Sequence, residues 1–223
     1  QRVHELGGRA RALGVDIDPA AVAAAQASVP AGEFDVDDAL RRRWDQGSVD
    51  VVVGNPPFLS QLAAATTRGG SSERGGGPYA DAAVEFLALA AELVRPDGGR
   101  VALVFPQSLL SSRDAAPVRR DLDERATLIW SWWRPQRVFD ADVNVCALAF
   151  EFGRPAASTS GSWGHVITRA LGIPALPALV TAGTLGDRAR LNANFRDEYY
   201  GMIPAVGDHD AGPPLVTSGL IDP

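Results

Sequence analysis

Residues 49–58 read VDVVVGNPPF, and this stretch decides the fold. Apart from Asp50, the run from Val49 to Val53 is made of β-branched valines, a pattern typical of a strand buried in a parallel sheet. Gly54 ends the run. We therefore expect Asn55–Phe58 at the carboxyl end of a strand, which is where open α/β sheets bind their ligands.

The turn Asn55-Pro56-Pro57-Phe58 has a specific chemical use. Each proline fixes its own φ, restricts the residue before it and lacks an N–H. The Asn55 amide oxygen and an aligned backbone carbonyl make two acceptors, which suit an exocyclic NH₂ with two hydrogens to donate. Holding both hydrogens frees the nitrogen lone pair for attack on a methyl sulfonium. Phe58 offers a face for stacking a planar base, worth about 1–3 kcal/mol, once that base is flipped out of a duplex. A plain strand-ending turn with Phe58 in the core is the alternative.

Elements on both sides of this turn alternate between strand and helix. Strands are expected at 12–17, 33–36, 49–53 and 100–105, followed by a strand pair at 127–133 and 143–152. Helices are expected at 19–27, 81–94 and 116–125, and another around 187–200. A Gly/Ser/Arg-rich loop covers 59–78. This order predicts a Rossmann-like, doubly wound, mostly parallel sheet with an antiparallel strand pair at one edge.

The bulk composition excludes several classes of protein. Hydrophobic residues make up 46% of the 223 residues, enough for a core. The single cysteine, Cys146, excludes an internal disulfide framework and a cysteine-rich zinc site, and three scattered histidines disfavour a metal cluster. No run approaches the length of a membrane span and no signal peptide is visible, so we expect a cytoplasmic protein. The net charge of −6 argues against strong nucleic-acid binding by this chain alone.

Three motifs together carry a family resemblance. GVDIDP at 14–19, DAL at 38–40 and VDVVVGNPPF at 49–58 occur in the order and spacing of the N6-adenine-specific DNA methyltransferases of the NPPF type. The segment at 79–110, YADAAVEFLALAAELVRPDGGRVALVFPQSLL, is similar to the helix and strand that follow the turn in these enzymes. The resemblance covers residues 1–152 and points to restriction–modification enzymes. It implies S-adenosyl-L-methionine as cofactor, DNA as partner through the full-length protein, and methyl transfer to the N6 amine of adenine.

The same resemblance assigns cofactor contacts at two strand ends. Asp16 would accept hydrogen bonds from the ribose hydroxyls, as the strand-end acid of a dinucleotide site does, and Ile17 would pack on the cofactor's adenine. Asp38 would receive the adenine amine, and Ala39 would supply a backbone contact. The alternative for Asp16 is a simple strand end, and Asp38 competes with the acids in Asp35–Asp37.

The target base receives its own residues from the resemblance. Asn55 and Pro56 would hold the target amine, Pro57 completes the catalytic turn, and Phe58 would stack on the base. Phe139 would form a second aromatic wall, with a place in the core as its alternative.

One family signature is absent from this sequence. The glycine-rich turn after the first strand of the family would lie immediately before Gln1. We therefore expect a fragment truncated at the N-terminus, whose sheet lacks a central strand, and which alone binds the cofactor poorly and methylates nothing. Residues 1–153 would be a partial catalytic domain. Residues 154–223 would be a linker and the start of an extension that leads to a DNA-recognition region.

Other functions remain open at this stage. Turns of this type also occur in methyltransferases that act on the glutamine amide of release factors or on guanine N2 of ribosomal RNA, because these targets are planar NH₂ groups too. Cytosine N4 fits the chemistry, although such enzymes usually carry a serine in place of Asn55. A catalytically inactive remnant that serves as a binding module is the alternative from another class.

Overall fold

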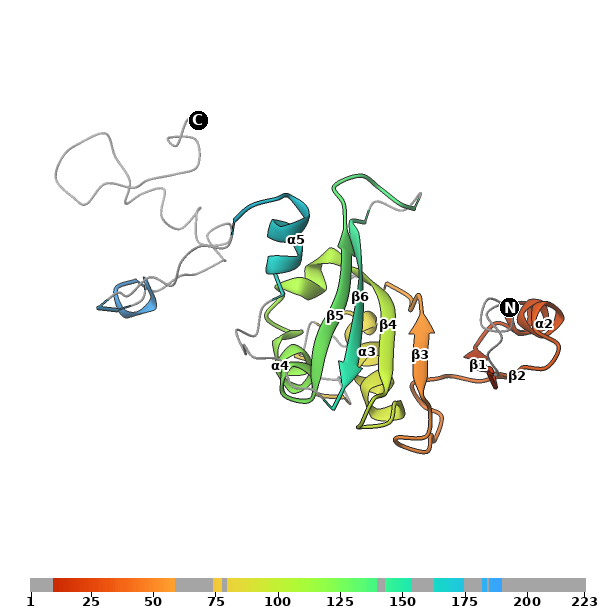
Figure 1. The fold of residues 1–223 in the computed structure, drawn as a ribbon. Helices are drawn as coiled ribbons and strands as arrows, with labels where there is room; N and C mark the ends of the chain where they lie inside the picture. The colour runs from red at the N-terminus through yellow and green to blue at the C-terminus, as the bar shows by residue number, and fades with distance from the viewer. Residues whose placement is uncertain are drawn as a thin grey trace, which may run out of the picture. The chain divides into compact units, whose positions relative to one another are not determined.

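The structure, a computed structural model, contains two sheets, four α-helices and two short 3₁₀ turns among the parts it describes (Figure 1). It describes residues 10–58, 74–77, 80–139, 143–153, 163–174, 182–183 and 185–189. The chain divides into two compact units, Gln1–Ala175 and Leu176–Pro223. Within the second unit, the described residues include one short 3₁₀ turn, η2 (Leu185–Asp187).

The first sheet is a parallel pair joined by a helix. Strand β1 (Leu13–Asp16) pairs with β2 (Glu33–Val36), and α2 (Pro19–Ser28) connects them. The helix begins where the sequence predicts, because Asp18 caps it by accepting a 2.8 Å hydrogen bond from the Ala20 N–H, and Pro19 occupies the first helical position.

The Phe34 ring of β2 packs closely against the backbone of β1. Gly14 lies opposite Phe34 in the strand register, and a Cβ at Gly14 would come within 2.5 Å of the ring. Only glycine fits there without displacing the Phe34 ring. Even so, no side chain of β1, α2 or β2 is fully buried. A strand–helix–strand unit with so little buried apolar surface needs a further packing partner to be stable.

The second sheet has four strands in the order β3-β4-β6-β5. Strand β3 (Val51–Gly54) is parallel to β4 (Arg100–Pro106), whereas β6 (Val145–Phe152) is antiparallel to both β4 and β5 (Ala126–Trp133). The antiparallel pair at one edge, predicted from two consecutive strands without a helix between them, is confirmed. A register shift between Leu128 and Trp130 marks a bulge in β5.

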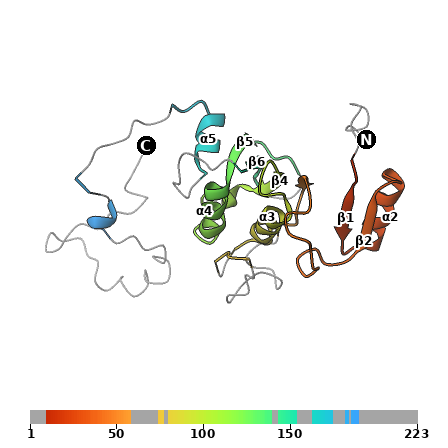
Figure 2. The same cartoon turned by 60° about the horizontal axis from the view of Figure 1, so that its bottom comes forward.

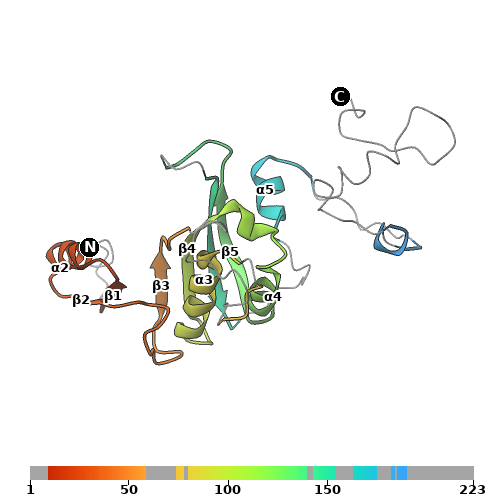
Figure 3. The ribbon, with the colours of Figure 1, turned by 180° about the vertical axis from the view of Figure 1, so that it is seen from behind.

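Helices α3 (Ala82–Leu93) and α4 (Ala116–Arg125) cover one face of this sheet (Figures 2 and 3). Asp81 caps α3 by accepting from the Ala83 N–H at 2.9 Å, and nearly every residue of this helix is buried. The 3₁₀ turn η1 (Gln107–Leu110) follows β4. The largest fully buried side chains of the resulting core are Phe105, Phe150, Phe152, Leu87, Leu109, Leu110, Leu122 and Leu148.

Strands β4 and β6 bury alternate residues. Val101, Leu103 and Phe105 are buried, and in the antiparallel register they lie opposite Phe150, Leu148 and Cys146, which are buried too. The intervening residues on the other face are small and only partly buried: Ala102, Val104, Ala147 and Ala149. A further layer of helices could pack closely against this face, because its apolar side chains are small.

Strands β1 and β3 are both edge strands, each with one side unpaired among the described residues. Strand β1 pairs only with β2, and β3 pairs only with β4. Val51 and Val53 of β3 expose 54% and 72% of their surface, although the sequence predicts a buried strand here. The prediction of burial is therefore wrong for Val51 and Val53, whereas Val52 between them packs against the core.

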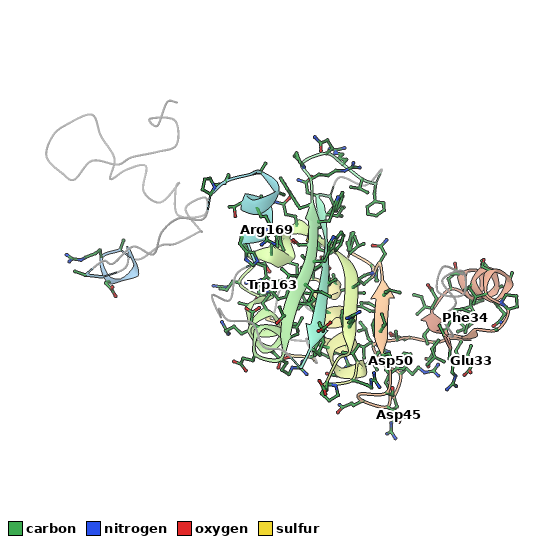
Figure 4. All side chains as sticks on the ribbon, viewed as in Figure 1. Glu33, Phe34, Asp45, Asp50, Trp163 and Arg169 are labelled. Carbon is green, nitrogen blue, oxygen red and sulfur yellow. The ribbon has the colours of Figure 1, made fainter. Side chains whose placement is uncertain are left out.

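A short helix beyond the expected linker also belongs to the first unit. Helix α5 (His165–Ala170) follows Trp163, whose ring lies 5.0 Å from that of Phe150 (centroid to centroid), and Val166 is buried in the same core. In Figure 4, Trp163 lies beside the four-stranded sheet at the start of α5. The expected loop 59–78 lies outside the described residues except for 74–77, and so does 190–200 of the expected helix around 187–200.

Candidate functional site

Three chain segments leave the four-stranded sheet at the same edge. Strands β3 and β4 are parallel, with Gly54 opposite Leu103, so Asn55–Phe58 and η1 both follow carboxyl ends. Strand β5 runs in the same direction as β4, because each is antiparallel to β6. The segment 134–139, which contains Phe139, therefore starts from this edge too (Figure 1). Ligands of α/β sheets bind at such an edge.

The turn after β3 presents the Asn55 amide to solvent. Asn55 and Pro57 are exposed, whereas Pro56 is buried. The Asn55 side chain makes no hydrogen bond to another described residue, so its amide oxygen is available. Phe58 packs against the hydrophobic core and remains partly exposed. The turn thus combines a fixed backbone with a free amide, as two acceptors for one NH₂ group require.

Phe139 belongs to the segment that follows β5 at this edge of the sheet. It exposes 40% of its surface, so it is not a core residue. Trp132, in β5 before this segment, has the guanidinium of Arg134 over its ring at 5.4 Å. An aromatic and a cationic side chain therefore stack on each other where this segment leaves the sheet.

The acids assigned to the cofactor lie at the carboxyl ends of β1 and β2, which the parallel pairing brings side by side. The Asp37 N–H donates to the Asp16 carbonyl at 3.0 Å. One carboxylate oxygen of Asp16 accepts from the Asp18 N–H at 2.9 Å, and its side chain is exposed. Ile17 exposes 74% of its surface, which is unusual for an isoleucine and leaves an aliphatic side chain open to solvent beside the acid.

Asp38 makes different contacts from Asp35 and Asp37, the two acids that compete with it for the cofactor role. Arg42 binds Asp35 at 2.6 Å and lies 3.9 Å from Asp37. Asp38 instead accepts from the Leu40 N–H at 3.0 Å, and Arg41 lies 3.4 Å from its other oxygen. Asp38 is thus held in a turn by its own backbone, while the competing carboxylates are engaged by Arg42.

The segment after Asp38 is further fixed by a tryptophan. The Trp44 indole N–H donates to the Ala39 carbonyl at 2.9 Å, and the Arg42 guanidinium lies 4.9 Å from the Trp44 ring centroid. This bond occupies the Ala39 carbonyl, and the backbone N–H of Ala39 donates to no described residue. Arg74 also reaches this segment, because it donates to the Leu40 carbonyl at 3.2 Å and forms an ion pair with Glu92 of α3. Sequence reasoning missed Arg74, which no motif contains.

An amide residue at the same edge was also missed. The Trp133 indole N–H donates to Oε1 of Gln107 at 2.9 Å, and the Gln107 backbone N–H donates to the Asn144 carbonyl at 2.8 Å. An open cleft of about 370 Å³ lies here and is lined by Pro106, Gln107, Ser108, Ser111, Val143 and Asn144. The only sequence signal was the position of Gln107 directly after the apolar strand 100–105.

Two features of the described residues limit the chemistry of the site. No three histidine, cysteine, aspartate or glutamate side chains gather there to hold a metal ion. Burial raises the pKa of the Cys146 thiol to about 12, so it is neutral and a poor nucleophile.

In the same described ranges, no helix has the length and apolar character needed to cross a membrane.

Comparisons with known proteins identify the fold. No protein-family model and no curated protein matches the sequence. Among solved structures, the modification subunit of a type I restriction enzyme from Vibrio vulnificus YJ016, described as putative, shares 23% identity with a TM-score of 0.52 over 65% of this chain and 33% of that one. The EcoKI M protein of a type I restriction enzyme shares 20% identity with a TM-score of 0.51 over 69% and 35%.

A third structure comes from a smaller protein. A putative class I S-adenosylmethionine-dependent methyltransferase from Listeria monocytogenes shares 18% identity with a TM-score of 0.55 over 77% of this chain and 57% of that one. This chain thus spans about a third of each type I subunit and somewhat more than half of the Listeria protein. At these identities the likeness concerns the fold alone, and the chain has the Rossmann-like α/β fold of these methyltransferases.

Proposed function

We propose that this chain is the catalytic part of an S-adenosyl-L-methionine-dependent methyltransferase that methylates the N6 amine of adenine in DNA. The observation that carries the proposal is the position of Asn55-Pro56-Pro57-Phe58 at the carboxyl end of β3, with the Asn55 amide exposed and free. The likeness in fold to type I modification subunits supports it.

The chemistry follows from the acceptors of the turn. The Asn55 amide oxygen and the Pro56 carbonyl accept the two hydrogens of the target amine, which draws the nitrogen towards tetrahedral geometry and exposes its lone pair. S-Adenosyl-L-methionine supplies a methyl group on a positively charged sulfur. The amine held by Asn55 and Pro56 would take this methyl group, S-adenosyl-L-homocysteine would be the leaving group, and the extra proton of the amine would pass to water. Phe58 and Phe139 hold the flipped base between aromatic faces.

The residues of the two-stranded sheet fit this cofactor. Asp16 has exposed carboxylate oxygens for the ribose hydroxyls, and the exposed Ile17 side chain suits one face of the adenine ring. Asp38, held beside Asp16 by the pairing of β1 and β2, would accept from the adenine amine, and the Ala39 N–H would donate to the ring. These groups would bind and orient the cofactor.

We further propose that a parallel strand joins the two sheets by pairing with β1 on one side and β3 on the other. The support is the pair of open edges, the exposed valines of β3, and the lack of any buried side chain in β1, α2 and β2. The product of the whole gene is called the full-length protein below. Without that strand, the 223 residues are expected to bind the cofactor poorly and to transfer no methyl group.

Two alternatives can be separated from the main proposal. A methyltransferase for another planar amine, in a protein glutamine or a guanine, would use the same turn. A catalytically inactive binding module has no need for a free Asn55 amide beside two prolines, and the net charge of −6 disfavours it as an independent nucleic-acid binder. Under the main proposal, residues 154–223 would lead towards a DNA-recognition region in the full-length protein.

Identification of the methylated product tests the proposal. The full-length protein is incubated with unmethylated bacterial genomic DNA and isotope-labelled S-adenosyl-L-methionine, and the digested nucleosides are analysed by mass spectrometry. Labelled N6-methyladenine is expected. Label only in N4-methylcytosine, in RNA or in protein would refute the adenine assignment, and no label in any of them would favour the inactive module.

A further inference from the structure

Arg74 joins the segment that follows β2 to helix α3. One guanidinium nitrogen, Nη2, donates to the Leu40 carbonyl at 3.2 Å, and the other, Nη1, binds the Glu92 carboxylate of α3. Because the guanidinium is a rigid plane, binding both groups at once fixes the Leu40 carbonyl relative to α3. The Arg74 side chain exposes only 18% of its surface and the Glu92 side chain 35%, so water screens this pair less than it screens a fully exposed one.

The peptide that Arg74 holds is part of the turn that carries Asp38. We call residues 38–42 the Asp38 turn. The Leu40 N–H donates to the Asp38 carboxylate at 3.0 Å, and the Arg42 N–H donates to the Asp38 carbonyl at 2.8 Å. Leu40 therefore binds Asp38 through its N–H and Arg74 through its carbonyl. A shift of the Leu40 carbonyl would be passed directly to the Asp38 carboxylate.

Helix α3 holds the same stretch of chain at a second point. The Gly47 N–H donates to the Glu92 carbonyl at 2.9 Å. Glu92 thus binds this stretch twice, through its own backbone and through the Arg74 side chain. Within the described residues, no side chain from beyond β3 other than Arg74 hydrogen-bonds the Asp38 turn. Since β1, α2 and β2 contain no fully buried side chain, the position of Asp38 depends on few contacts.

Arg74 itself is placed by a fixed backbone. It belongs to the loop that follows the catalytic turn, and the described stretch 74–77 ends at Gly77. The Gly77 N–H donates to the Asp114 carbonyl at 2.7 Å, and a Cβ at Gly77 would collide with the Asp114 side chain. The stretch is therefore bonded at both ends, so Arg74 gives up little further freedom when it binds the Asp38 turn.

We propose that Arg74 is a positioning residue for the cofactor, which holds the Asp38 turn so that the Asp38 carboxylate and the Ala39 N–H meet the amine and a ring nitrogen of the cofactor's adenine. The inference rests on the proposed function and adds a residue that no motif contains. In this role Arg74 acts through Leu40 and Asp38 and needs no contact with the cofactor. Its loss should weaken recognition of the adenine ring and leave the transfer step at Asn55 unchanged.

Two ligands separate the positioning of Asp38 from a general effect on the cofactor site. Isothermal titration calorimetry of the full-length protein compares S-adenosyl-L-homocysteine with S-inosyl-L-homocysteine, in which a carbonyl replaces the adenine amine. The parent should prefer the adenine ligand by about tenfold or more, because the Asp38 carboxylate needs that amine as donor. Arg74→Ala should lower the affinity for the adenine ligand about fivefold. The affinity for the inosine ligand should hardly change, so the preference should shrink.

Three further variants show whether the effect passes through Asp38. Arg74→Lys keeps a positive charge beside Glu92 and should recover part of the lost affinity. The double variant of Arg74→Ala with Asp38→Ala should bind the adenine ligand no more weakly than Asp38→Ala alone. Arg95→Ala is the matched control, because it removes an exposed 2.8 Å ion pair with Asp50 that lies outside the Asp38 turn. It should bind both ligands as the parent does.

Several results would overturn the role of Arg74. These are an unchanged affinity in Arg74→Ala, equal losses for the two ligands, or the same loss in Arg95→Ala. Methyl transfer at saturating S-adenosyl-L-methionine should stay near the parent rate in Arg74→Ala, and a slower rate with unchanged affinity would also contradict positioning of the cofactor. A parent that binds both ligands equally well would refute the roles of Asp38 and Arg74 alone. A parent that binds neither ligand would refute the proposed function itself.

Discussion

Trp163 donates its indole N–H to Oδ1 of Asp123 at 2.9 Å, and both side chains are buried. Asp123 belongs to α4, so this bond attaches the chain beyond residue 162 to the helices under the four-stranded sheet. The Trp163 backbone N–H adds a 2.8 Å bond to the Leu110 carbonyl. The segment leading to the C-terminal region is thus anchored at its start, although the sequence around 154–162 has the composition of a linker.

This anchor predicts a stability effect. Trp163→Phe keeps an aromatic ring against Phe150 but leaves a buried carboxylate oxygen without its donor, so unfolding free energy should fall by about 1–3 kcal/mol. Urea unfolding measures the change. Trp44→Phe removes an indole N–H from a partly exposed backbone bond and should cost less. Equal losses in the two variants would mean that the Trp163–Asp123 bond contributes no more to the unfolding free energy than the Trp44–Ala39 bond does.

Cys146 should be chemically silent in the folded protein. Its thiol is fully buried, and burial raises its pKa to about 12, so the thiolate fraction at pH 8 is negligible. The folded chain should therefore not react with a thiol-specific disulfide reagent at this pH, and should react with one equivalent after denaturation in urea. Rapid labelling without denaturant would show that the β4–β6 region opens.

The open edge of β3 predicts a difference in hydrogen exchange. In a parallel pair, alternate amides of a strand face opposite edges. The amides of Val51–Gly54 that do not face β4 should exchange quickly in the 223-residue chain and slowly in the full-length protein, where the proposed strand pairs with them. Strand β6, paired on both edges, serves as the internal control. Unchanged exchange of β3 in the full-length protein would rule out the inserted strand.

Asp16 should control cofactor binding. Asp16→Asn in the full-length protein replaces a charged acceptor of the ribose hydroxyls by a neutral amide, which should weaken S-adenosyl-L-methionine binding about tenfold or more. Asp50→Asn is the matched control. Asp50 is exposed and lies before the amino end of β3, whereas Asp16 lies at the carboxyl end of β1. The Asp50 carboxylate pairs with the Arg95 guanidinium at 2.8 Å. Isothermal titration calorimetry gives both affinities, and similar values for the two variants would remove Asp16 from the cofactor site.

Local sequence signals predicted most of the fold. Asp18-Pro19 and Asp81 place helix starts because capping depends on neighbouring residues, and the valine-rich run locates β3. Long-range features were not predictable in this way. The Gln107–Trp133 bond spans 26 residues and the Trp163–Asp123 bond spans 40, and neither leaves a periodic pattern. The exposure of Val53 was also missed, because burial of a strand depends on which neighbours pair with it.

The central claim concerns the acceptors of Asn55, and one comparison tests it most directly. Methyl transfer to DNA and S-adenosyl-L-methionine affinity are measured together for the full-length protein, for Asn55→Ala and for the exposed-site control Gln46→Ala. The account predicts that Asn55→Ala abolishes formation of N6-methyladenine while cofactor affinity stays close to that of the parent, and that Gln46→Ala changes neither. Retained methylation in Asn55→Ala, or a parallel loss of cofactor binding, would contradict a role for Asn55 in holding the target amine.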